Sequence, residues 1–314
     1  KTVISDIIEP EVFGKYMIQK TTDKSALLQS GICSADSNIV MGAGNTIVNL
    51  PFWKNLTGDD EILSDSTAMS VGNITTGKDI ACVHLRGRAW SANDLASILA
   101  GDNAMTAIGN KTADYWQKQI QKVLINSLAG AFASTDVAEK LVNNISTKSG
   151  AEAVISADAM LDTMAKLGDK SDELTGIMMS SATMFKLLKQ DLIDYIPASE
   201  GKSALATYMG KRVIVDDSLA GADGVESIYF FGNGAVAFNE GTDVINVETD
   251  RDTLAGDDLL ITRRQFTMHP RGIKWIGEPT GVTPSNAELA TGTNWSLVEE
   301  PKNVAITKLI CKLA

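Results

Sequence analysis

The two histidines of the chain, His84 and His269, limit the chemistry that its side chains can perform. A histidine-based zinc site needs further Cys, His or carboxylate ligands nearby, and no Cys or His pair in the chain has ligand spacing. His84 lies in an alternating, strand-like segment, and His269 precedes a turn that contains proline. We therefore expect both histidines to be structural, and we predict no metal site.

Glycine and serine motifs give no catalytic or nucleotide-binding signature. The segments GAGN (42–45) and GNGA (232–235) lack the spacing of a phosphate-binding loop and do not open a helix with G-x-G-x-x-G. The G-x-S-x-G motif of a nucleophile elbow is absent. These glycines are typical of turns, and the sequence predicts no catalytic residue and no cofactor.

Acidic residues are the remaining candidates for acid–base or cation chemistry. Asp216 and Asp217 follow a strand-like segment, where they could be catalytic or could cap the next segment. Asp59, Asp60 and Glu61 form a triplet in a polar stretch, which could bind a cation but is typical of a solvated loop. A hydrolase that uses the carboxylates near Asp216 therefore stays open as an alternative function.

Basic residues gather in two segments of a chain whose formal net charge is −11. Arg86 and Arg88 share a strand face with His84 and Trp90, and further basic residues bracket the HPRG turn at 269–272. An acidic chain is a poor candidate for tight nucleic-acid binding, but basic patches can make weak, non-specific phosphate contacts. They can also pair with acidic surfaces of a neighbouring copy. Our candidate intersubunit contacts are the charged residues of these segments and of the polar stretch: Lys54, Asp59, Asp60, Glu61, Arg86, Arg88, Arg263, Arg264 and Arg271.

The composition is that of an ordinary globular protein. The chain has 314 residues, 44% hydrophobic and 21% charged, which allows one large or two medium domains. Cys33, Cys82 and Cys311 are far apart, so we expect buried thiols in a reducing compartment rather than disulfides. No apolar run approaches the ~18 residues of a membrane span, so we predict no membrane contact. The sequence also shows no apolar h-region of a signal peptide. The first residue, Lys1, is compatible with removal of a leader and with trimming.

The longest helical pattern spans residues 111–134, and the rest of the chain must be arranged around it. Asn110 or Thr112 can cap its start. At about 1.5 Å per residue the helix would be roughly 35 Å long, so it needs packing partners along its whole length. Its apolar residues recur at intervals of three and four and share one stripe: Trp116, Ile120, Val123, Leu124, Leu128, Ala131 and Phe132.

Two strand-like segments flank a long polar stretch within residues 38–92. Residues 46–53 alternate, and Pro51 argues against a central strand because proline lacks the ladder donor. Residues 79–90 alternate again, with Ala81, Val83, Leu85 and Ala89 on the face opposite His84 and Trp90. We predict a two-stranded ribbon that projects from the body. Because such a ribbon is marginal alone, we expect it to lean on another subunit.

The flanking regions differ in pattern. Residues 1–37 contain short helical pieces and predict an arm that packs against something else. Residues 156–240 alternate between helical and strand-like segments, including a helix that we expect to stop at Pro197, and predict a compact α/β domain. Residues 241–314 are dominated by strands, which we expect to lie along the long helix. The predicted fold class is α+β.

This order of elements resembles that of the major capsid proteins of tailed bacteriophages, which have the Hong Kong 97-type fold. The segments VHLRGRAWSANDLASILAGDNAM (83–105) and RRQFTMHPRGIKWIG (263–277) resemble one branch of these coat proteins. The resemblance covers essentially the whole chain. It implies five parts: an N-terminal arm (1–37), an extended β-ribbon loop (38–92), a peripheral domain (93–155) with the 111–134 helix as its spine, an α/β axial domain (156–240) and a β-rich return to the peripheral domain (241–314).

The resemblance also implies a function. The chain would be a coat protein, not an enzyme, that assembles into an icosahedral head around double-stranded DNA. Its partners would be many copies of itself in hexamers and pentamers, with portal, scaffold and decoration proteins as further partners and weak, non-specific contact with packaged DNA. We expect it in the virion, after assembly in the cytoplasm of the bacterial host. Some family members form Lys–Asn cross-links, but the ribbon lysines Lys54 and Lys78 single out no such site.

Two structural alternatives stay open beside the hydrolase. An encapsulin-type compartment would use the same fold and enclose a cargo enzyme, and chain length and ribbon do not separate it from a phage head. A phage tail or baseplate protein would also be β-rich and oligomeric, although the long central helix argues against it.

Overall fold

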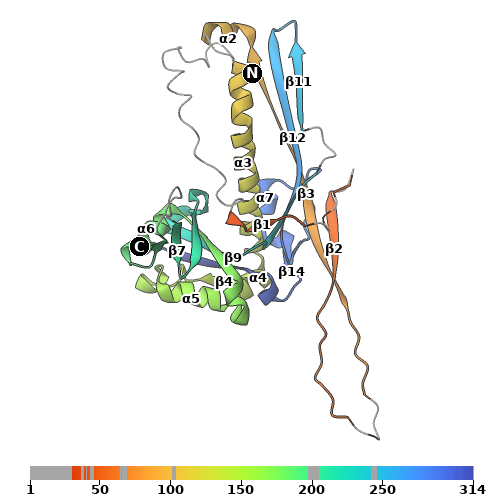
Figure 1. The fold of residues 1–314 in the computed structure, drawn as a ribbon, viewed down its shortest axis with the longest axis vertical. Coiled ribbons are helices and arrows are strands. Elements are labelled where there is room, and N and C mark those ends of the chain that lie inside the picture. The colour runs from red at the N-terminus through yellow and green to blue at the C-terminus, as the bar shows by residue number, and fades with distance from the viewer. Residues whose placement is uncertain are drawn as a thin grey trace.

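The computed structural model describes residues 30–313, except 37–38, 40, 43–45, 64, 66–68, 101–103, 197–204 and 242–245. The arm that we predict for residues 1–37 lies almost wholly outside the described residues. Figure 1 shows an elongated molecule. A long helix runs along a sheet, a compact lobe lies beside one end of that helix, and a two-stranded ribbon projects away from both.

The central helix, α3, spans Ala104–Ala131 and contains 28 residues. It confirms that a long helix exists, but the helix both begins and ends earlier than the predicted range of 111–134. Asn110 and Thr112, the expected caps, lie inside it, and the Thr112 hydroxyl donates to the carbonyl oxygen of Ile108 at 2.8 Å. The residues before the predicted start contain no proline, so nothing stops the helix there.

The first sheet packs along α3 and has six strands. They are β1 (Cys33–Ser34), β2 (Ile47–Trp53), β3 (Thr76–Asn93), β10 (Val236–Glu240), β11 (Val247–Asp252) and β12 (Asp257–Pro270). The strand order is β1-β10-β12-β3-β2, and β11 also pairs with β12. β2 is an edge strand, which confirms the expectation from Pro51.

The alternating residues 79–90 do form a strand, but the buried face changes along it. Ala81 and His84 are both fully buried although they lie on opposite faces. Farther along, Leu85 is 38% exposed, whereas Trp90 on the other face packs edge-on against Tyr115 of α3, with ring centroids 5.0 Å apart. α3 therefore covers the Trp90 face, and the Leu85 face is left open.

The second sheet has seven strands and forms the lobe. They are β4 (Val142–Asn144), β5 (Leu174–Met179), β6 (Asp194–Ile196), β7 (Leu205–Tyr208), β8 (Lys211–Val215), β9 (Val225–Gly232) and β15 (Ile306–Lys312). The order is β4-β15-β9-β5-β8-β7-β6. Three helices accompany these strands: α4 (Thr135–Leu141), α5 (Ala157–Ala165) and α6 (Ser181–Lys189). Helices and strands alternate here, as the sequence pattern predicts.

Two boundaries in the lobe differ from the predictions. α6 does not continue to Pro197, because Asp191 has a φ of +57° that a helix does not allow, and β6 follows instead. The last strand, β15, pairs with β9 and β4 and so belongs to the lobe. Residues 241–314 therefore do not all lie along α3. The reason is that Ile306 and Leu309 are fully buried, and a place between two strands gives β15 that burial.

The remaining elements are short, and β13 and β14 pair as a separate two-stranded sheet. They are α2 (Asp94–Ala100), β13 (Ile273–Trp275), α7 (Asn286–Leu289), β14 (Trp295–Leu297) and the 3₁₀ helices η3 (Gly150–Ala153), η4 (Gly168–Glu173), η5 (Asp217–Leu219), η6 (Ala222–Gly224), η7 (Gly292–Asn294) and η8 (Pro301–Asn303). α7 sits directly on α3, where a Cβ at Gly130 would lie 1.9 Å from the carbonyl oxygen of Leu289. That oxygen accepts a hydrogen bond from the Trp295 indole at 2.8 Å. The contact therefore requires a glycine in α3.

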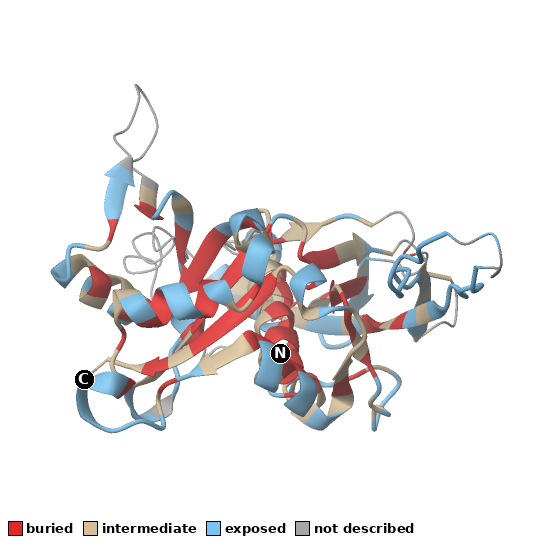
Figure 2. Ribbon diagram, turned by 90° about the horizontal axis from the view of Figure 1, so that it is seen from below, coloured by how far each residue is buried: buried red, intermediate tan, exposed pale blue. Residues whose placement is uncertain are grey.

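The buried residues form one large core and one small cluster. Figure 2 shows burial concentrated in the body and exposure along the ribbon. The large core joins α3 to both sheets. The small cluster lies at the root of the ribbon and contains Ile39, Val48, Ala81, Val83 and Ala237. No helix among the described residues is long and apolar enough to cross a bilayer.

Candidate assembly surfaces

The carboxylates after β8 cap a turn. Asp216 is the N-cap of η5, where its side chain accepts from the Ser218 amide at 2.8 Å and from the Gln121 side-chain amide. Asp217 accepts from the Ser181 amide at 2.9 Å, and hydrogen bonds from Ser181 lower the pKa of Asp217. Of the two interpretations of this pair, capping is confirmed, because both carboxylates are used by nearby donors.

Both histidines are buried in the core, which confirms their structural role. Burial and the nearby charge of Arg86 lower the pKa of His84 to about 3, so its ring is neutral. The ring lies against Phe266, with centroids 5.2 Å apart. His269 contacts the Asp79 carboxylate through Nε2 at 2.9 Å. In the described part of the chain, no group of three or more His, Cys, Asp or Glu residues is placed to hold a metal ion.

The three cysteines are free thiols. Burial raises the pKa of each, Cys33, Cys82 and Cys311, to about 12. Cys82 and Cys311 are buried as expected, whereas Cys33 is half-buried by exposed area. At neutral pH these thiols are protonated and therefore unreactive.

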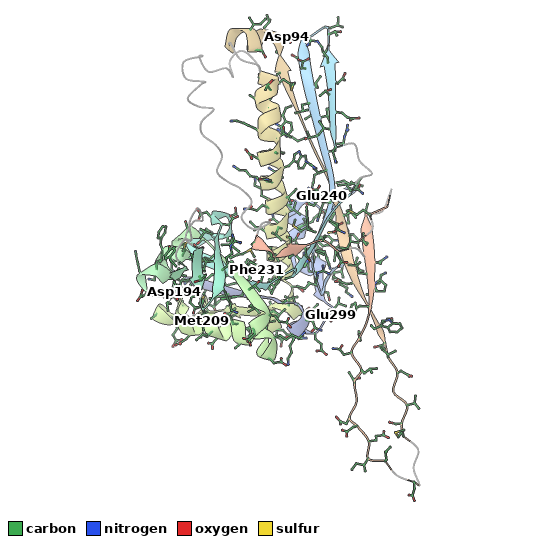
Figure 3. The ribbon with its side chains drawn as sticks, viewed as in Figure 1. Asp94, Asp194, Met209, Phe231, Glu240 and Glu299 are labelled. Atoms are coloured by element: carbon green, nitrogen blue, oxygen red, sulfur yellow. The ribbon has the colours of Figure 1, made fainter. Side chains whose placement is uncertain are left out.

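The loop between β2 and β3, residues 54–75, carries a group of exposed apolar side chains. Ile62 is 97% exposed, Val71 91%, Leu56 79% and Leu63 77%. Figure 3 shows this loop projecting away from the body. Exposed apolar surface on a projecting loop is the usual mark of an interaction site.

The predicted charged contacts of this loop lie beside the apolar ones. Lys54, Asp59 and Asp60 are exposed. Glu61 accepts hydrogen bonds from the hydroxyl and the amide of Ser70, and these bonds lower the pKa of Glu61. They also tie the two sides of the loop together. The acidic triplet therefore lies next to apolar side chains, on a loop that the bonds between Ser70 and Glu61 hold together.

The two predicted arginines of β3 lie in different environments. Arg86 is half-buried, and its Nη2 donates to the carbonyl oxygen of Pro284 at 2.6 Å and to Oδ1 of Asn286 at 3.1 Å. It therefore holds the segment around α7 against β3. Arg88 is exposed, and its backbone carbonyl oxygen accepts a hydrogen bond from the Thr262 hydroxyl at 3.0 Å. Of the two, Arg88 is the better placed to meet a neighbouring copy.

The remaining predicted arginines have partners within the chain. Arg263 and Arg264 lie on β12, whereas Arg271 lies at the turn that follows it. They form three ion pairs: Arg263 with Glu248, Arg264 with Glu240 at 3.8 Å, and Arg271 with Asp36. Partly exposed pairs of this kind contribute little stability, so they can exchange partners when another copy binds.

A second group of exposed apolar residues lies at the far end of α3 and was missed among the predicted contacts. Leu95 and Ile98 of α2 and Leu254 of the β11–β12 hairpin are 60%, 73% and 99% exposed. Arg251 bonds Asp94 at 2.6 Å and holds the hairpin against α2. Figure 3 places Asp94 at the end opposite the ribbon loop. The apolar face of α2 was visible in the sequence, but only charged residues were considered as contacts.

Two apolar surfaces at opposite ends of an elongated molecule suit repeated association. One copy can meet different neighbours at its two ends, and such head-to-tail contacts build rings and larger assemblies. The arrangement therefore fits a building block.

Sequence comparison finds a matching protein family and a closely similar relative. The Gp13-like family, described as "Major capsid protein 13-like", matches residues 93–305. The major capsid protein of Bacillus phage SPP1 is 41% identical over 318 residues, which cover 98% of this chain and 97% of that protein.

Solved structures share the fold at low sequence identity. The head structure of Helicobacter pylori bacteriophage KHP40 has a TM-score of 0.58 at 11% identity, with 95% and 94% of the two chains covered. The capsid of an empty GTA particle has a TM-score of 0.58 at 15% identity, with 94% and 92% covered. The SrpI encapsulin of Synechococcus elongatus PCC 7942 has a TM-score of 0.59 at 10% identity, with 94% and 90% covered. At these identities the likeness establishes the fold alone, a mixed helix-and-sheet capsid fold.

The family match covers more than half of the chain, and the full-length relative confirms it. The exposed apolar side chains of the ribbon loop agree with a structural role. The chain belongs to the major capsid proteins of tailed bacteriophages, which are structural proteins of the head shell and not enzymes.

Proposed function

We propose that this chain forms hexamers and pentamers that close into an icosahedral head around double-stranded DNA. The observation that carries the proposal is the ribbon loop, whose apolar residues Ile62, Leu63 and Val71 are exposed in the single chain. Burying one such side chain is worth about 1.5–3 kcal/mol, so a surface of another copy that covers them would stabilise the assembly.

The Hong Kong 97-type arrangement assigns a role to each part of the chain. Residues 38–92 are the extended loop that reaches a neighbouring copy, and residues 93–155 form the peripheral domain with α3 as its spine. Residues 156–240 form the axial domain, which gathers around the five-fold and six-fold axes. β10 is an exception because it pairs with β12 in the first sheet, whereas β4, from the preceding range, pairs with β15 in the sheet of the axial domain. Residues 241–314 return to the peripheral domain as far as β13 and β14, after which β15 completes the sheet of the axial domain. Residues 1–37 form the arm.

Charge complementarity supplies the specificity of the contact between copies. The acidic triplet of the loop, Asp59, Asp60 and Glu61, meets basic residues of a neighbour, and exposed Arg88 is the first candidate. Lys54 adds a positive charge to the same loop. Arg86, Arg263, Arg264 and Arg271 act as secondary contacts that exchange their present partners.

Other partners follow from the same role. Portal, scaffold and decoration proteins bind the shell during its assembly in the host cytoplasm, and the finished virion retains the coat. The net charge of −11 keeps contact with packaged DNA weak and non-specific, because few phosphates can be neutralised.

An encapsulin-type compartment is the second candidate, because the SrpI encapsulin shares the fold with a TM-score of 0.59. The two functions differ in what the shell encloses. A phage head protects DNA from nuclease, whereas an encapsulin retains a cargo protein. The 41% identity to a phage major capsid protein favours the head.

The test is to express the full chain and examine it by sedimentation and negative-stain electron microscopy. We expect icosahedral shells with hexameric and pentameric units. Particles isolated from phage-producing cells should contain nuclease-protected DNA and no cargo enzyme. A stable monomer at every protein and salt concentration would contradict the proposal, and shells filled with a cargo protein would favour the encapsulin.

A further inference from the structure

The ribbon leaves the body at a fork in the first sheet. β3 pairs with β12 as far as Val83, which lies opposite Thr267. Beyond that point β12 continues beside β10, with Ala237 opposite His269, while β3 continues beside β2. A two-stranded ribbon is marginal by itself. A contact outside the strand ladder must therefore fix the direction in which the ribbon leaves.

Asp79 bridges this fork. Its Oδ2 accepts a hydrogen bond from Nε2 of His269 at 2.9 Å and one from the Gly272 amide at 3.1 Å. Asp79 is 8% exposed and His269 1% exposed, so both bonds form away from water, where charge-assisted hydrogen bonds are strong. Burial alone would raise the pKa of Asp79, but the hydrogen bonds from His269 and from the Gly272 and Ile80 amides outweigh it and lower the pKa. The carboxylate is therefore ionised at neutral pH and can only accept.

An open cleft beside the fork leaves the ribbon room to move. The cleft has a volume of about 630 Å³ and separates the base of β2, at Leu50 and Phe52, from Arg271 and Glu299 of the body. Figure 3 shows Glu299 beside the root of the ribbon. The charged groups that face Asp79 across the cleft are Arg271 with its partner Asp36, Glu299 and His269. The small cluster that contains Val48, Ala81 and Ala237 packs at the ribbon root, and the cleft leaves one side of the root without such packing.

We propose that Asp79 is a positioning residue that fixes the direction of the ribbon relative to the body through its bonds to His269 and Gly272. The inference rests on the proposed function, in which the ribbon must reach a neighbouring copy. A ribbon that already points in one direction loses less conformational entropy when it docks. Asp79 therefore promotes assembly without contacting the neighbour.

The test measures the ribbon direction as a distance within one chain. Nitroxide labels are placed at Asn73 in the ribbon and Glu139 on α4, both exposed, in a Cys33→Ser background that leaves the two buried cysteines in place. The labelled chain is diluted with unlabelled protein, so that electron–electron double resonance reports distances within a chain. We expect a single narrow distance distribution for the parent.

Four variants separate positioning from general stability. Asp79→Asn removes the charged acceptor, and His269→Leu removes the donor. Both variants should broaden the distance distribution. His269→Gln keeps an N–H near the position of Nε2 and should restore the narrow distribution. Asp36→Asn removes a carboxylate from the same cleft that binds Arg271 instead of the ribbon, and it should leave the distance unchanged.

Each outcome decides the proposal. Narrow distributions in both Asp79→Asn and His269→Leu would overturn it, and so would equal broadening in Asp36→Asn. If Asp79→Asn does not fold, the contrast between His269→Leu and His269→Gln decides alone. Shell formation by the unlabelled parent is scored separately by electron microscopy. Absence of shells would refute the proposed function, whereas the distances would still decide the role of Asp79.

Discussion

The ribbon loop and the lobe use apolar residues in opposite ways. In the lobe, Ile177, Phe230 and Leu309 lie on strands of one sheet and are fully buried within the chain. In the loop, Ile62 and Val71 are almost completely exposed. Apolar burial stabilises a state only where it occurs, so the lobe residues stabilise the single chain, and under the proposed function the loop residues stabilise contacts between chains. If that proposal holds, folding and assembly depend on separate parts of one sequence.

The largest expected effect comes from placing a charge in the core. Leu124 of α3 is fully buried, and Leu124→Asp both removes an apolar side chain and buries an unpaired carboxylate. We expect a loss of at least about 4 kcal/mol of unfolding free energy, which is comparable to the whole stability of many domains. Circular dichroism should show no cooperative unfolding, and electron microscopy should show no shells.

The matched control is the same change in the ribbon loop. Leu63 is 77% exposed, so Leu63→Asp should alter the unfolding free energy by no more than about 0.5 kcal/mol. It should nevertheless prevent or strongly weaken shell formation. If Leu63→Asp assembles as well as the parent does, the loop does not contact a neighbour and the distinction between the two regions fails.

Adding one methyl group to α3 should have the next largest effect. A Cβ at Gly130 would lie 1.9 Å from the Leu289 carbonyl oxygen, so Gly130→Ala forces α7 away from α3. We expect a loss of about 3 kcal/mol, near the upper end for overpacking, measured by urea unfolding. Gly109→Ala in the same helix meets nothing within 4 Å and should instead stabilise the chain by up to about 1 kcal/mol. Equal effects at both positions would mean that α7 does not rest on α3.

Acid should reveal how the ribbon is joined to the body. The pKa of Asp79 is lowered in the folded chain, so the unfolded chain binds more protons at this residue between its unfolded pKa, about 3.9, and the lower folded value. Stability from Asp79 is therefore fully present above about pH 5 and is lost as the pH falls through the folded pKa.

The measurement is the unfolding free energy of the parent and of Asp79→Asn between pH 7 and pH 2. The difference between them should be constant above about pH 5 and should shrink as the parent becomes protonated. Asp59→Asn in the exposed loop serves as the control and should follow the parent at every pH. If the unfolding free energies of the parent and of Asp79→Asn differ by the same amount from pH 7 to pH 2, Asp79 does not titrate in this range.

Local patterns predicted the elements of this fold better than their partners. The recurrence of Trp116, Leu124 and Leu128 was enough to identify α3, and Pro51 was enough to identify an edge strand. Helix ends failed where the sequence offers several starting points: Asp102 and Asn103 are cap residue types as good as Asn110 and Thr112, and α3 begins at Ala104. The end of α6 depends on the positive φ of Asp191, a residue type that helices also accept.

The sequence alone did not show which strands pair with each other when they are far apart along the chain. The apolar alternation of Ile306 to Cys311 predicts a strand, but nothing local says that it pairs with β9 instead of lying along α3. The same limit applies to the charged residues. Arg271 and Asp36 are far apart in the sequence and meet in space, and Asp79 and His269 do likewise. The exposure of Lys54, Asp59 and Asp60 was easier to predict, because they lie in a polar stretch between two strands.

The smallest effect on stability, and the most specific test of the comparison, comes from reversing charge in the loop. Asp60→Lys should leave the unfolding free energy within about 0.5 kcal/mol of the parent, because the side chain is exposed. It should raise the protein concentration needed for assembly about fivefold, which corresponds to one lost ion pair of about 1 kcal/mol. Light scattering against protein concentration measures this shift.

Salt and a second substitution then identify the nature and the partner of the contact. In 1 M salt the Debye length is about 3 Å, so Asp60→Lys and the parent should need almost the same protein concentration for assembly. Combining Asp60→Lys with Arg88→Glu recreates opposite charges and should restore most of the assembly if Arg88 of a neighbour faces the triplet. Lys54→Glu combined with Arg88→Glu places like charges in both positions and should assemble no better than either single variant. A defect that persists in high salt would instead assign the loop contact to its apolar residues, since burial of Ile62 and Leu63 does not weaken as salt is added.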